Sequence, residues 1–331
     1  MSQNELVSMI DNALVIPSAD EMQARLEALD EAAAQHDTRN ANTKRGYEDD
    51  WKVWQTYTAE LRIPTLAATT GSFTGFVLWL VQKGMAPNTI DRRVTGATVM
   101  LREHGVTIPQ AASDRARETL DAYKRNLAET GEQRGRGQAR AVSIRDLRAM
   151  SAALPDTLAG IRDRAILLVG FGMAARRSEL ANLLGRDVVL HTEGLTVDIR
   201  FGKTKPRTSP IPHGSNPLTC PVRAWRAWSE SVTIDPDGPA FRRIDRHGNV
   251  LGKMAAQSIG DRVAAAAVGA GLPATTAHGL RAGLATEARR AGHDAKTIAL
   301  QGGWSPTSSA LYEYMRIADQ WSDNAVAGIG L

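Results

Sequence analysis

Apolar residues recur at helical spacing in four successive stretches between residues 38 and 128, and this pattern is the strongest constraint on the fold. Residues on one face of an α-helix lie three or four positions apart, so each stretch predicts an amphipathic helix. Turn residues such as Gly84 and Pro87 separate the stretches. Residues 38–128 therefore predict a compact all-helical domain. The repeated positions are Tyr47, Trp51, Trp54 and Leu61, then Phe73, Phe76, Val77 and Leu80, then Ile90, Val94, Ala97 and Leu101, and finally Ala116, Leu120, Tyr123 and Leu127.

Two segments of unusual composition flank this domain. Residues 1–37 carry eight acidic residues against one basic residue, Arg25, and predict an acidic helical leader. Because the whole chain has a net charge of +4, the remainder is distinctly basic, which suits a polyanionic partner or an ordinary solvated surface equally well. Residues 129–141 are rich in glycine and arginine and predict an interdomain linker. Its Arg134, Arg136 and Arg140 either follow a phosphate backbone or belong to a solvated tether.

Residues 142–331 predict a second domain of α+β class, and 331 residues suffice for two ordinary domains. Ser143 has the character of a helix N-cap, and residues 161–184 are strongly apolar and helical. The stretch GLTVDIRFGKTKPRTSPIP, residues 194–212, alternates in polarity and is broken by Gly202 and Pro206. It predicts a β-hairpin or a small three-stranded sheet. Helical patterns return at residue 221, so the chain as a whole is mainly α.

Composition excludes several classes of protein. The single cysteine, Cys220, excludes a disulfide framework and favours a reducing compartment. The sequence has no apolar run of about 18 residues and no basic segment followed by an apolar core, so neither a membrane span nor a secretory signal is expected. Location in the cytoplasm follows as an expectation. A metallohydrolase using His278, Glu287 and His293 is disfavoured, because no familiar metal-ligand spacing occurs, and no metal or cofactor is expected.

Two stretches contain basic residues that can contribute to a catalytic or binding site. In ARRSELANLLGRDV, Arg176 and Glu179 are three residues apart and share a helix face, which by itself is more typical of a surface ion pair. In FGKTKPRTSPIP, Lys203 and Lys205 lie at the tip of the predicted hairpin. A lysine there can reach into a site and donate a proton, although solvated turn lysines are the simpler interpretation.

Two further stretches carry groups that can take part in acid–base or nucleophilic chemistry. In TTAHGLRAG, Thr275 or Thr276 can cap a helix on which His278 and Arg281 are three residues apart. Histidine titrates near neutrality, and arginine forks onto phosphate oxygens, although a lone histidine is usually structural.

The stretch LQGGWSPTSSALYEYMR contains Trp304 and two tyrosines. Its Ser305 and Pro306 predict a helix start, with a cap followed by a first-turn proline. Tyr312 and Tyr314 would then point about 200° apart around that helix. Only one of them can face a given cleft.

Taken together and in this order, the four stretches resemble the tyrosine recombinase (phage integrase) family, and most closely its Cre-like members. Arginine with glutamate, a hairpin lysine, His-x-x-Arg, a tryptophan where most members have histidine, and a terminal tyrosine follow one another across residues 140–320. The helical amino-terminal unit and the segment HGLRAGLATEARRAGH extend the resemblance over nearly everything after residue 38. The fold implied is a mainly α, two-domain DNA clamp, with a helical core-binding (SAM-like) domain and a catalytic domain.

The resemblance implies a site-specific recombinase that cleaves and rejoins DNA through a 3′-phosphotyrosyl intermediate, without metal or ATP. Tyr314 matches the nucleophile better than Tyr312, and Lys203 matches the hairpin lysine better than Lys205. The partner implied is double-stranded DNA with a palindromic site, bound by a homotetramer on two sites. A topoisomerase of type IB, a telomere resolvase with the same chemistry, and a non-catalytic DNA-binding relative are the alternatives. The catalytic set implied is Arg176, Glu179, Lys203, His278, Arg281, Trp304 and Tyr314.

Basic and polar side chains near the predicted helix starts, in the linker, in the hairpin and in a second basic cluster, FRRIDRHG, are expected to bind the DNA. Asn42 or Asn88 can cap a helix, and exposed helix N–H groups suit phosphates. Most of these contacts are expected to set affinity rather than to read bases. The expected DNA-binding residues are Lys44, Arg45, Asn88, Thr89, Arg92, Arg93, Arg134, Arg136, Arg140, Lys205, Arg207, Arg242, Arg243 and Arg246.

Overall fold

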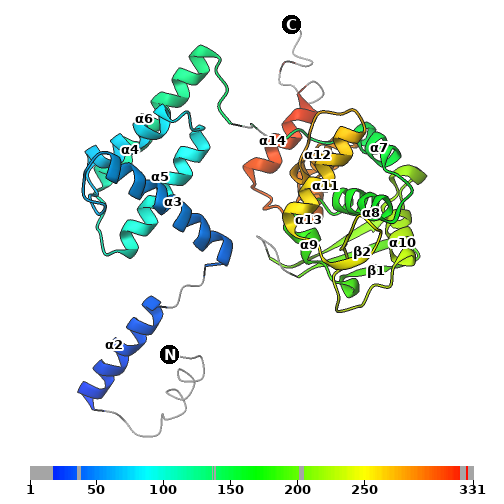
Figure 1. Ribbon diagram of the computed structural model, residues 1–331, viewed down its shortest axis with the longest axis horizontal. Helices are drawn as coiled ribbons and strands as arrows, with labels where there is room; N and C mark the ends of the chain where they lie inside the picture. Colours follow the sequence, from blue (N-terminus) through cyan, green and yellow to red (C-terminus); the bar gives the residue numbers. More distant parts are fainter. Residues whose placement is uncertain are drawn as a thin grey trace. The chain divides into compact units, whose positions relative to one another are not determined.

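The computed structural model describes residues 18–35, 39–135, 137, 139–200, 205–320 and 326. The chain divides into two compact units, Met1–Gly137 and Gln138–Leu331. Figure 1 shows the elements of the first unit in blue to green and those of the second in green to red. None of the helices described is long and apolar enough to cross a membrane.

In its described part, the first unit is built from helices alone. They are α2 (Ala19–Gln35), α3 (Ala41–Glu60), α4 (Thr70–Gln82), α5 (Pro87–Glu103) and α6 (Gln110–Thr130). Helix α3 packs on α5, and α4 packs on α6. The predicted stripes are confirmed as the core, in which the rings of Trp54, Tyr57, Phe73 and Phe76 lie within 5.0–5.5 Å of a neighbouring ring centroid. Three expected members lie outside this core cluster. Tyr47 is only half-buried, and Leu127 is buried but not part of the cluster. Leu61 is exposed, because α3 has ended there and Leu61 is its C-cap.

Two of the predicted helix caps are wrong. Asn40, not Asn42, caps α3, and its side chain accepts a hydrogen bond from the Thr43 backbone N–H at 2.9 Å. Helix α5 begins directly with Pro87 after Ala86, so Asn88 lies inside its first turn. Proline fits this first position because its missing N–H would have no partner within the helix.

A close approach of α3 and α5 depends on a glycine. A Cβ added at Gly96 on α5 would collide with the side chain of Asp50 on α3, and both residues are buried. Asp50 Oδ1 forms ion pairs with Arg92 Nη1 at 2.6 Å and with Arg93 Nη1 at 3.2 Å. This contact therefore fixes two of the expected DNA-binding arginines on α5.

We expect Gly96→Ala to lower the free energy of opening of α3 and α5 by about 1–3 kcal/mol, because the buried pair has to move apart. Hydrogen–deuterium exchange of the two helices in the full chain measures this change. Gly46→Ala on α3 is the matched control, since a Cβ there meets nothing within 4 Å. Alanine is the better helix former, so the control should exchange no faster than the wild type. Equal exchange in both variants would contradict the packing described.

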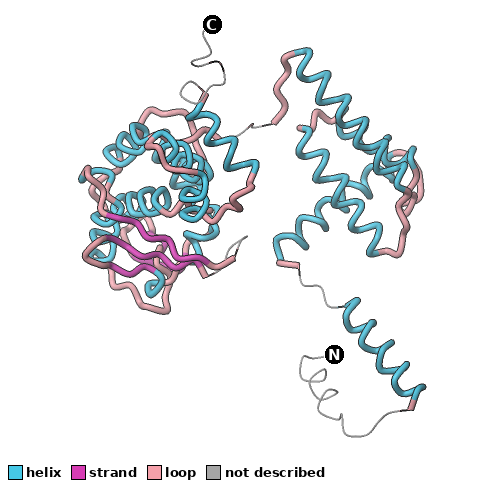
Figure 2. Tube along the Cα trace, turned by 180° about the vertical axis from the view of Figure 1, so that it is seen from behind, coloured by secondary structure: helices cyan, strands magenta, loops and turns pink. Residues whose placement is uncertain are grey.

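The helices and strands of the second unit share a large hydrophobic core, and Figure 2 shows strands, in magenta, along one side of this unit. The predicted hairpin is confirmed: β2 pairs with β1 and with β3, all antiparallel, in the order β1-β2-β3. A two-stranded sheet of β4 and β5 follows. The strands are β1 (Val188–Leu190), β2 (Gly194–Ile199), β3 (Arg207–Pro212), β4 (Arg242–Ile244) and β5 (Val250–Lys253).

Eight α-helices are described in this unit, together with two short 3-10 turns, Gly185–Asp187 and Pro217–Thr219. Ser143 caps the first helix as predicted, with its hydroxyl accepting from the Asp146 backbone N–H at 3.1 Å. Helices α12, α13 and α14 pack on one another around a separate small core (Figure 1). The helices are α7 (Ile144–Ala153), α8 (Leu158–Gly172), α9 (Arg177–Asn182), α10 (Pro221–Ser231), α11 (Ala256–Gly269), α12 (Ala277–Arg290), α13 (Ala295–Gly302) and α14 (Ser309–Asp319), of which α9 is a single short piece of six residues.

Candidate active site

The expected helix over residues 161–184 is broken, and the break creates one wall of the candidate site. Helix α8 ends at Gly172, and Ala174 adopts a left-handed backbone with φ of 49° before α9 begins. That conformation is unfavourable for alanine and persists only where surrounding contacts hold it. The backbone carbonyl of Ala174 accepts a hydrogen bond from Arg281 Nη1 at 2.6 Å, which supplies such a contact.

Arg176 occupies the N-cap of α9, and Glu179 lies at its third position. The Glu179 carboxylate accepts from the Arg176 backbone N–H at 3.0 Å and from Arg176 Nη1 at 2.6 Å. Glu179 is only 1% exposed. Burial alone would raise the pKa of this carboxyl, but hydrogen bonds from Arg207 and Arg176 outweigh burial and hold its pKa below the ordinary value. Glu179 is therefore an ionised anchor for the Arg176 side chain.

Arg281 is among the most buried charged side chains of the unit, at 1% exposure. Its Nη1 also donates to the Gly302 carbonyl at 2.6 Å, so it joins the turn before α9 to the end of α13. Its guanidinium carbon lies 3.7 Å from the centroid of the half-buried Trp304 ring. Nη2 has no hydrogen-bond partner among the described residues. Burial, followed by the charge of Arg176, lowers the pKa of Arg281 to about 9. These features suit an arginine that receives an anion.

His278 lies in the first turn of α12, and its Nε2 is 2.7 Å from the Tyr314 hydroxyl. Thr276 takes the N-cap position of this helix, but its side chain makes no capping hydrogen bond. As a whole residue, His278 is exposed to solvent. Partial burial first, and then the charges of Arg281 and Arg176, lower the pKa of His278 below its ordinary value of 6.5. The lowered pKa favours the neutral imidazole at pH 7, and the tautomer with an unprotonated Nε2 can accept a proton from the Tyr314 hydroxyl.

Helix α14 separates the two tyrosines as predicted. Tyr314 is 3% exposed and faces His278 and Trp304, whereas Tyr312 is 52% exposed on another side of the helix. The predicted start of this helix is wrong, because Ser308 is its N-cap and Ser305 instead begins a turn, its carbonyl accepting from the Ser308 N–H at 2.9 Å. The helix is therefore about one turn shorter at its beginning than the sequence suggested.

The hairpin contributes one site residue that was expected elsewhere. Arg207 was expected on the DNA-binding surface, but its guanidinium pairs with Glu179 at 3.0 Å and its side chain is 9% exposed. Lys203 lies outside the described residues, and Lys205 is exposed. The structure thus brings together six of the seven residues of the implied catalytic set, all except Lys203. Arg207 is an additional residue of this site, in contact with Glu179. Nothing in the spacing of the hairpin residues distinguishes Arg207 from its solvent-exposed neighbours.

The remaining expected DNA-binding residues are spread over both units. Arg134 pairs with Glu132 at 2.6 Å, and Arg140 pairs with Asp146 at 3.0 Å. Arg242 is half-buried and donates to the Leu251 carbonyl at 2.8 Å. Arg136 lies outside the described residues. Lys44 and Thr89 are half-buried, and the exposed members are Arg45, Asn88, Arg92, Arg134, Arg140, Lys205, Arg243 and Arg246.

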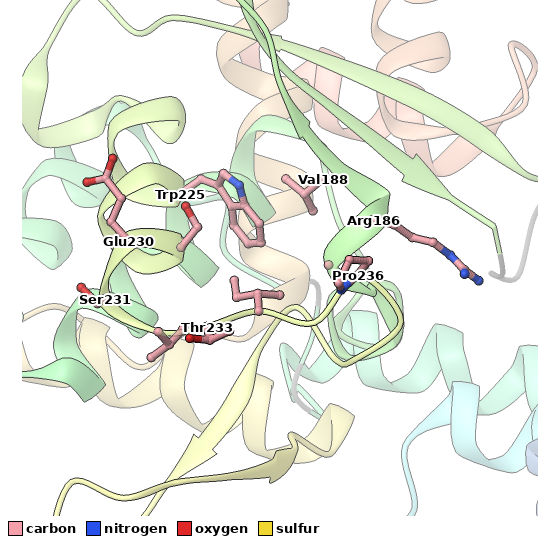
Figure 3. Close-up of a pocket in the computed structure, with 11 residues that line it drawn as sticks. Arg186, Val188, Trp225, Glu230, Ser231, Thr233 and Pro236 are labelled. Carbon is pink, nitrogen blue, oxygen red and sulfur yellow. The ribbon is translucent and has the colours of Figure 1, made fainter.

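A separate pocket of about 510 Å³ lies where α10 and the loop after it meet β1. Figure 3 shows Trp225, Val188 and Pro236 around it, with Arg186 at the side. None of the candidate site residues described above lines this pocket. Among the residues that the structure describes, no group of three or more His, Cys, Asp or Glu side chains is arranged to hold a metal ion.

Comparison with known proteins identifies the family. Residues 142–320 match the model of the phage integrase family. An integrase/recombinase xerD homolog of Selenomonas ruminantium is 26% identical over 296 residues, covering 86% of this chain and 84% of that protein.

Two solved structures show the same fold at low sequence identity. The Tn1549 transposon integrase in complex with a circular intermediate DNA has a TM-score of 0.60 and 14% identity, covering 86% of this chain and 92% of that chain. A lambda integrase dimer bound to a COC′ core site has a TM-score of 0.53 and 13% identity, covering 95% of this chain and 81% of that chain. Since the family model spans more than half of the residues, this chain belongs to the phage integrase family of tyrosine recombinases.

Proposed function

We propose that this site-specific recombinase cleaves DNA with the hydroxyl of Tyr314 and holds the cleaved strand as a 3′-phosphotyrosyl ester. The observation that carries the assignment is the 2.7 Å contact between Tyr314 Oη and His278 Nε2. A free tyrosine has a pKa of about 10 and is a poor nucleophile at neutral pH. A neutral imidazole at hydrogen-bond distance, beside two arginines, supplies the base and the positive field that the phenol needs.

The proposed step balances as a transesterification. Tyr314 Oη attacks the phosphorus, and its proton passes to His278 Nε2. The bond from phosphorus to the 5′-oxygen breaks, and Lys203 protonates that oxygen; Lys205 is the alternative donor. Arg176 and Arg281 stabilise the charge that builds on the non-bridging oxygens. Trp304 donates its indole N–H to a phosphate oxygen and has no proton to exchange.

The ester conserves the energy of the phosphodiester, so rejoining needs only the 5′-hydroxyl of a partner strand. Recombination then requires four such exchanges, and we propose a homotetramer on two palindromic sites in the cytoplasm. The two units would clamp the DNA, with the basic residues of α3, α5, the linker and the β4–β5 sheet on its phosphates. The expected boundaries, with a leader to residue 37, a core-binding domain to 128, a linker to 141 and a catalytic domain beyond, belong to this proposal.

The decrease in the cleavage rate at low pH (the acid limb of the pH profile) should follow the protonation of His278. The pKa of His278 lies below its ordinary value, so the neutral form predominates at pH 7 and is lost as the pH falls through that lowered pKa. We expect a constant cleavage rate from about pH 7 to pH 8 and a decrease below pH 6.5. Single-turnover cleavage across this range measures the profile. His278→Gln should be slower and should lose the acid limb, while an unchanged limb in that variant would contradict the assignment.

Trapping the covalent intermediate tests the proposed function. The wild type is incubated with EDTA and a nicked cognate site that cannot be rejoined, and the adduct is read on a denaturing gel. An EDTA-resistant protein–DNA adduct is expected. A protein that binds its site without forming any adduct would instead be the non-catalytic relative. Relaxation of supercoiled DNA by a monomer, without joining two sites, would favour the topoisomerase alternative.

A further inference from the structure

Arg207, the first residue of β3, makes a forked contact with the candidate site. Its Nη2 lies 3.0 Å from Glu179 Oε2, and its Nη1 lies 3.2 Å from Glu179 Oε1. The same Nη2 donates to the Met173 carbonyl at 3.3 Å. Such two-point pairing fixes the plane of a carboxylate as well as its position, which a single charge does not do.

Glu179 is thereby held from two sides. Arg207 comes from β3, and Arg176 contacts the same carboxylate through its backbone N–H and its Nη1. Arg281, on α12, adds a third positive charge that acts on this carboxylate at longer range. The orientation of Arg176 therefore depends on a carboxylate that Arg207 holds in place.

Arg207 also lies against the turn at Gly303, directly before Trp304. Gly303 has a left-handed backbone with φ of 63°, and a Cβ added there would lie 2.8 Å from Arg207 Cδ and 3.0 Å from its Nε. One side chain thus contacts the turn before α9, Glu179 and the turn after α13. Each of these carries or adjoins a residue of the proposed catalytic set.

We propose that Arg207 is a positioning residue that acts through Glu179, holding its carboxylate so that Arg176 is oriented for the scissile phosphate before DNA binds. This inference rests on the proposed function and goes beyond it, because Arg207 is assigned no contact with the reacting atoms. Two other roles are possible for a buried arginine here. It could contact the phosphate itself, since its Nε has no hydrogen-bond partner among the described residues, or it could only support the fold.

A double-mutant cycle separates these roles. The variants are Arg207→Gln, Glu179→Gln and the double variant, compared by the single-turnover rate of adduct formation at saturating protein. We expect each single variant to be slower by roughly 100-fold, because misplacing a group by about 1 Å costs that much. The double variant should be no slower than the worse single variant. Two independent roles would multiply to roughly 10⁴-fold, and that result would overturn the proposal.

The pH dependence provides a readout that a purely structural role would not change. Without Arg207, Glu179 stays buried with Arg176 as its remaining hydrogen-bonded cation and Arg281 further away, so burial raises its pKa. The ratio of the Arg207→Gln rate to the wild-type rate should then rise with increasing pH, as the carboxylate ionises. Taking the ratio removes the shared titration of His278. A ratio that is flat with pH would contradict the role through Glu179.

Matched variants control for charge and folding. Arg207→Lys keeps the charge without the fork and should recover part of the rate, to roughly 10-fold below wild type. It also preserves the test if Arg207→Gln does not fold, as judged by circular dichroism. Arg262→Gln removes one of two arginines from another buried carboxylate, Asp163, and should form adduct at nearly the wild-type rate. A wild-type rate in Arg207→Gln would overturn this inference alone, whereas no adduct from the wild type would overturn the proposed function as well.

Discussion

Tyr314→Phe should abolish the covalent adduct while leaving DNA binding intact. The variant removes one oxygen atom from a side chain that is otherwise buried in the small core of α12, α13 and α14. Loss of a nucleophile costs at least about 10⁴-fold in rate, because no other group forms the same covalent bond. The measurement is adduct formation on the nicked site at a protein concentration that saturates the DNA.

Tyr312→Phe is the matched control, since the same atom is removed two residues away on the same helix. Its ring is largely exposed and faces away from His278, so adduct should form within about twofold of the wild type, as for most surface substitutions. Loss of the adduct in Tyr312→Phe together with its retention in Tyr314→Phe would keep the family but move the nucleophile. Binding of both variants is followed separately by mobility shift.

Arg281→Lys should have the second largest effect, a decrease of about 10²–10³-fold in the cleavage rate. The guanidinium holds the carbonyls of Ala174 and Gly302 through Nη1 and keeps Nη2 for an incoming anion. Lysine retains the charge but cannot place donors at all three positions, and it does not stack as a planar group on Trp304. Single-turnover cleavage gives the rate, and a thermal melt shows how much of the loss comes from unfolding.

Arg290→Lys is the control for this experiment, because Arg290 lies on the same helix and pairs with Glu287 at the surface. We expect its cleavage rate to remain within about twofold of the wild type. Equal rates for Arg281→Lys and Arg290→Lys would contradict the role given to Arg281. A large loss of stability in Arg281→Lys with a normal rate in the folded fraction would assign Arg281 to the fold alone.

Periodicity predicted the parts of this molecule that depend on local sequence. The stripes around Trp54, Phe76 and Leu101 became the core of the first unit, because residues three and four apart share a helix face. The alternation in residues 194–212 predicted the hairpin of β2 and β3, in which the structure places Val197 opposite Ser209 with both residues buried. Helix geometry likewise predicted that Tyr312 and Tyr314 lie on different sides of one helix, and on α14 the first is exposed and the second is buried.

Contacts distant in sequence explain what the pattern could not predict. Residues 173–175 are Met-Ala-Ala, good helix formers, yet the helix breaks there because Arg281 binds the Ala174 carbonyl from 107 residues away. Arg207 resembles any basic residue near a hairpin tip, and only its contact with Glu179 shows its place in the site. Cap positions were misplaced at Asn42 and Ser305 by a few residues, since several polar residues compete for each cap.

Mapping the covalent bond in the wild-type adduct tests the central claim most directly. The adduct formed in EDTA is digested with nuclease and protease, and the peptide that retains a nucleotide is sequenced by mass spectrometry. The account predicts a 3′-phosphotyrosyl nucleotide on Tyr314 and an unmodified Tyr312 in the same peptide. A nucleotide on Tyr312, on a serine or on a histidine, or a link through a 5′-phosphate, would contradict the proposed chemistry of this site.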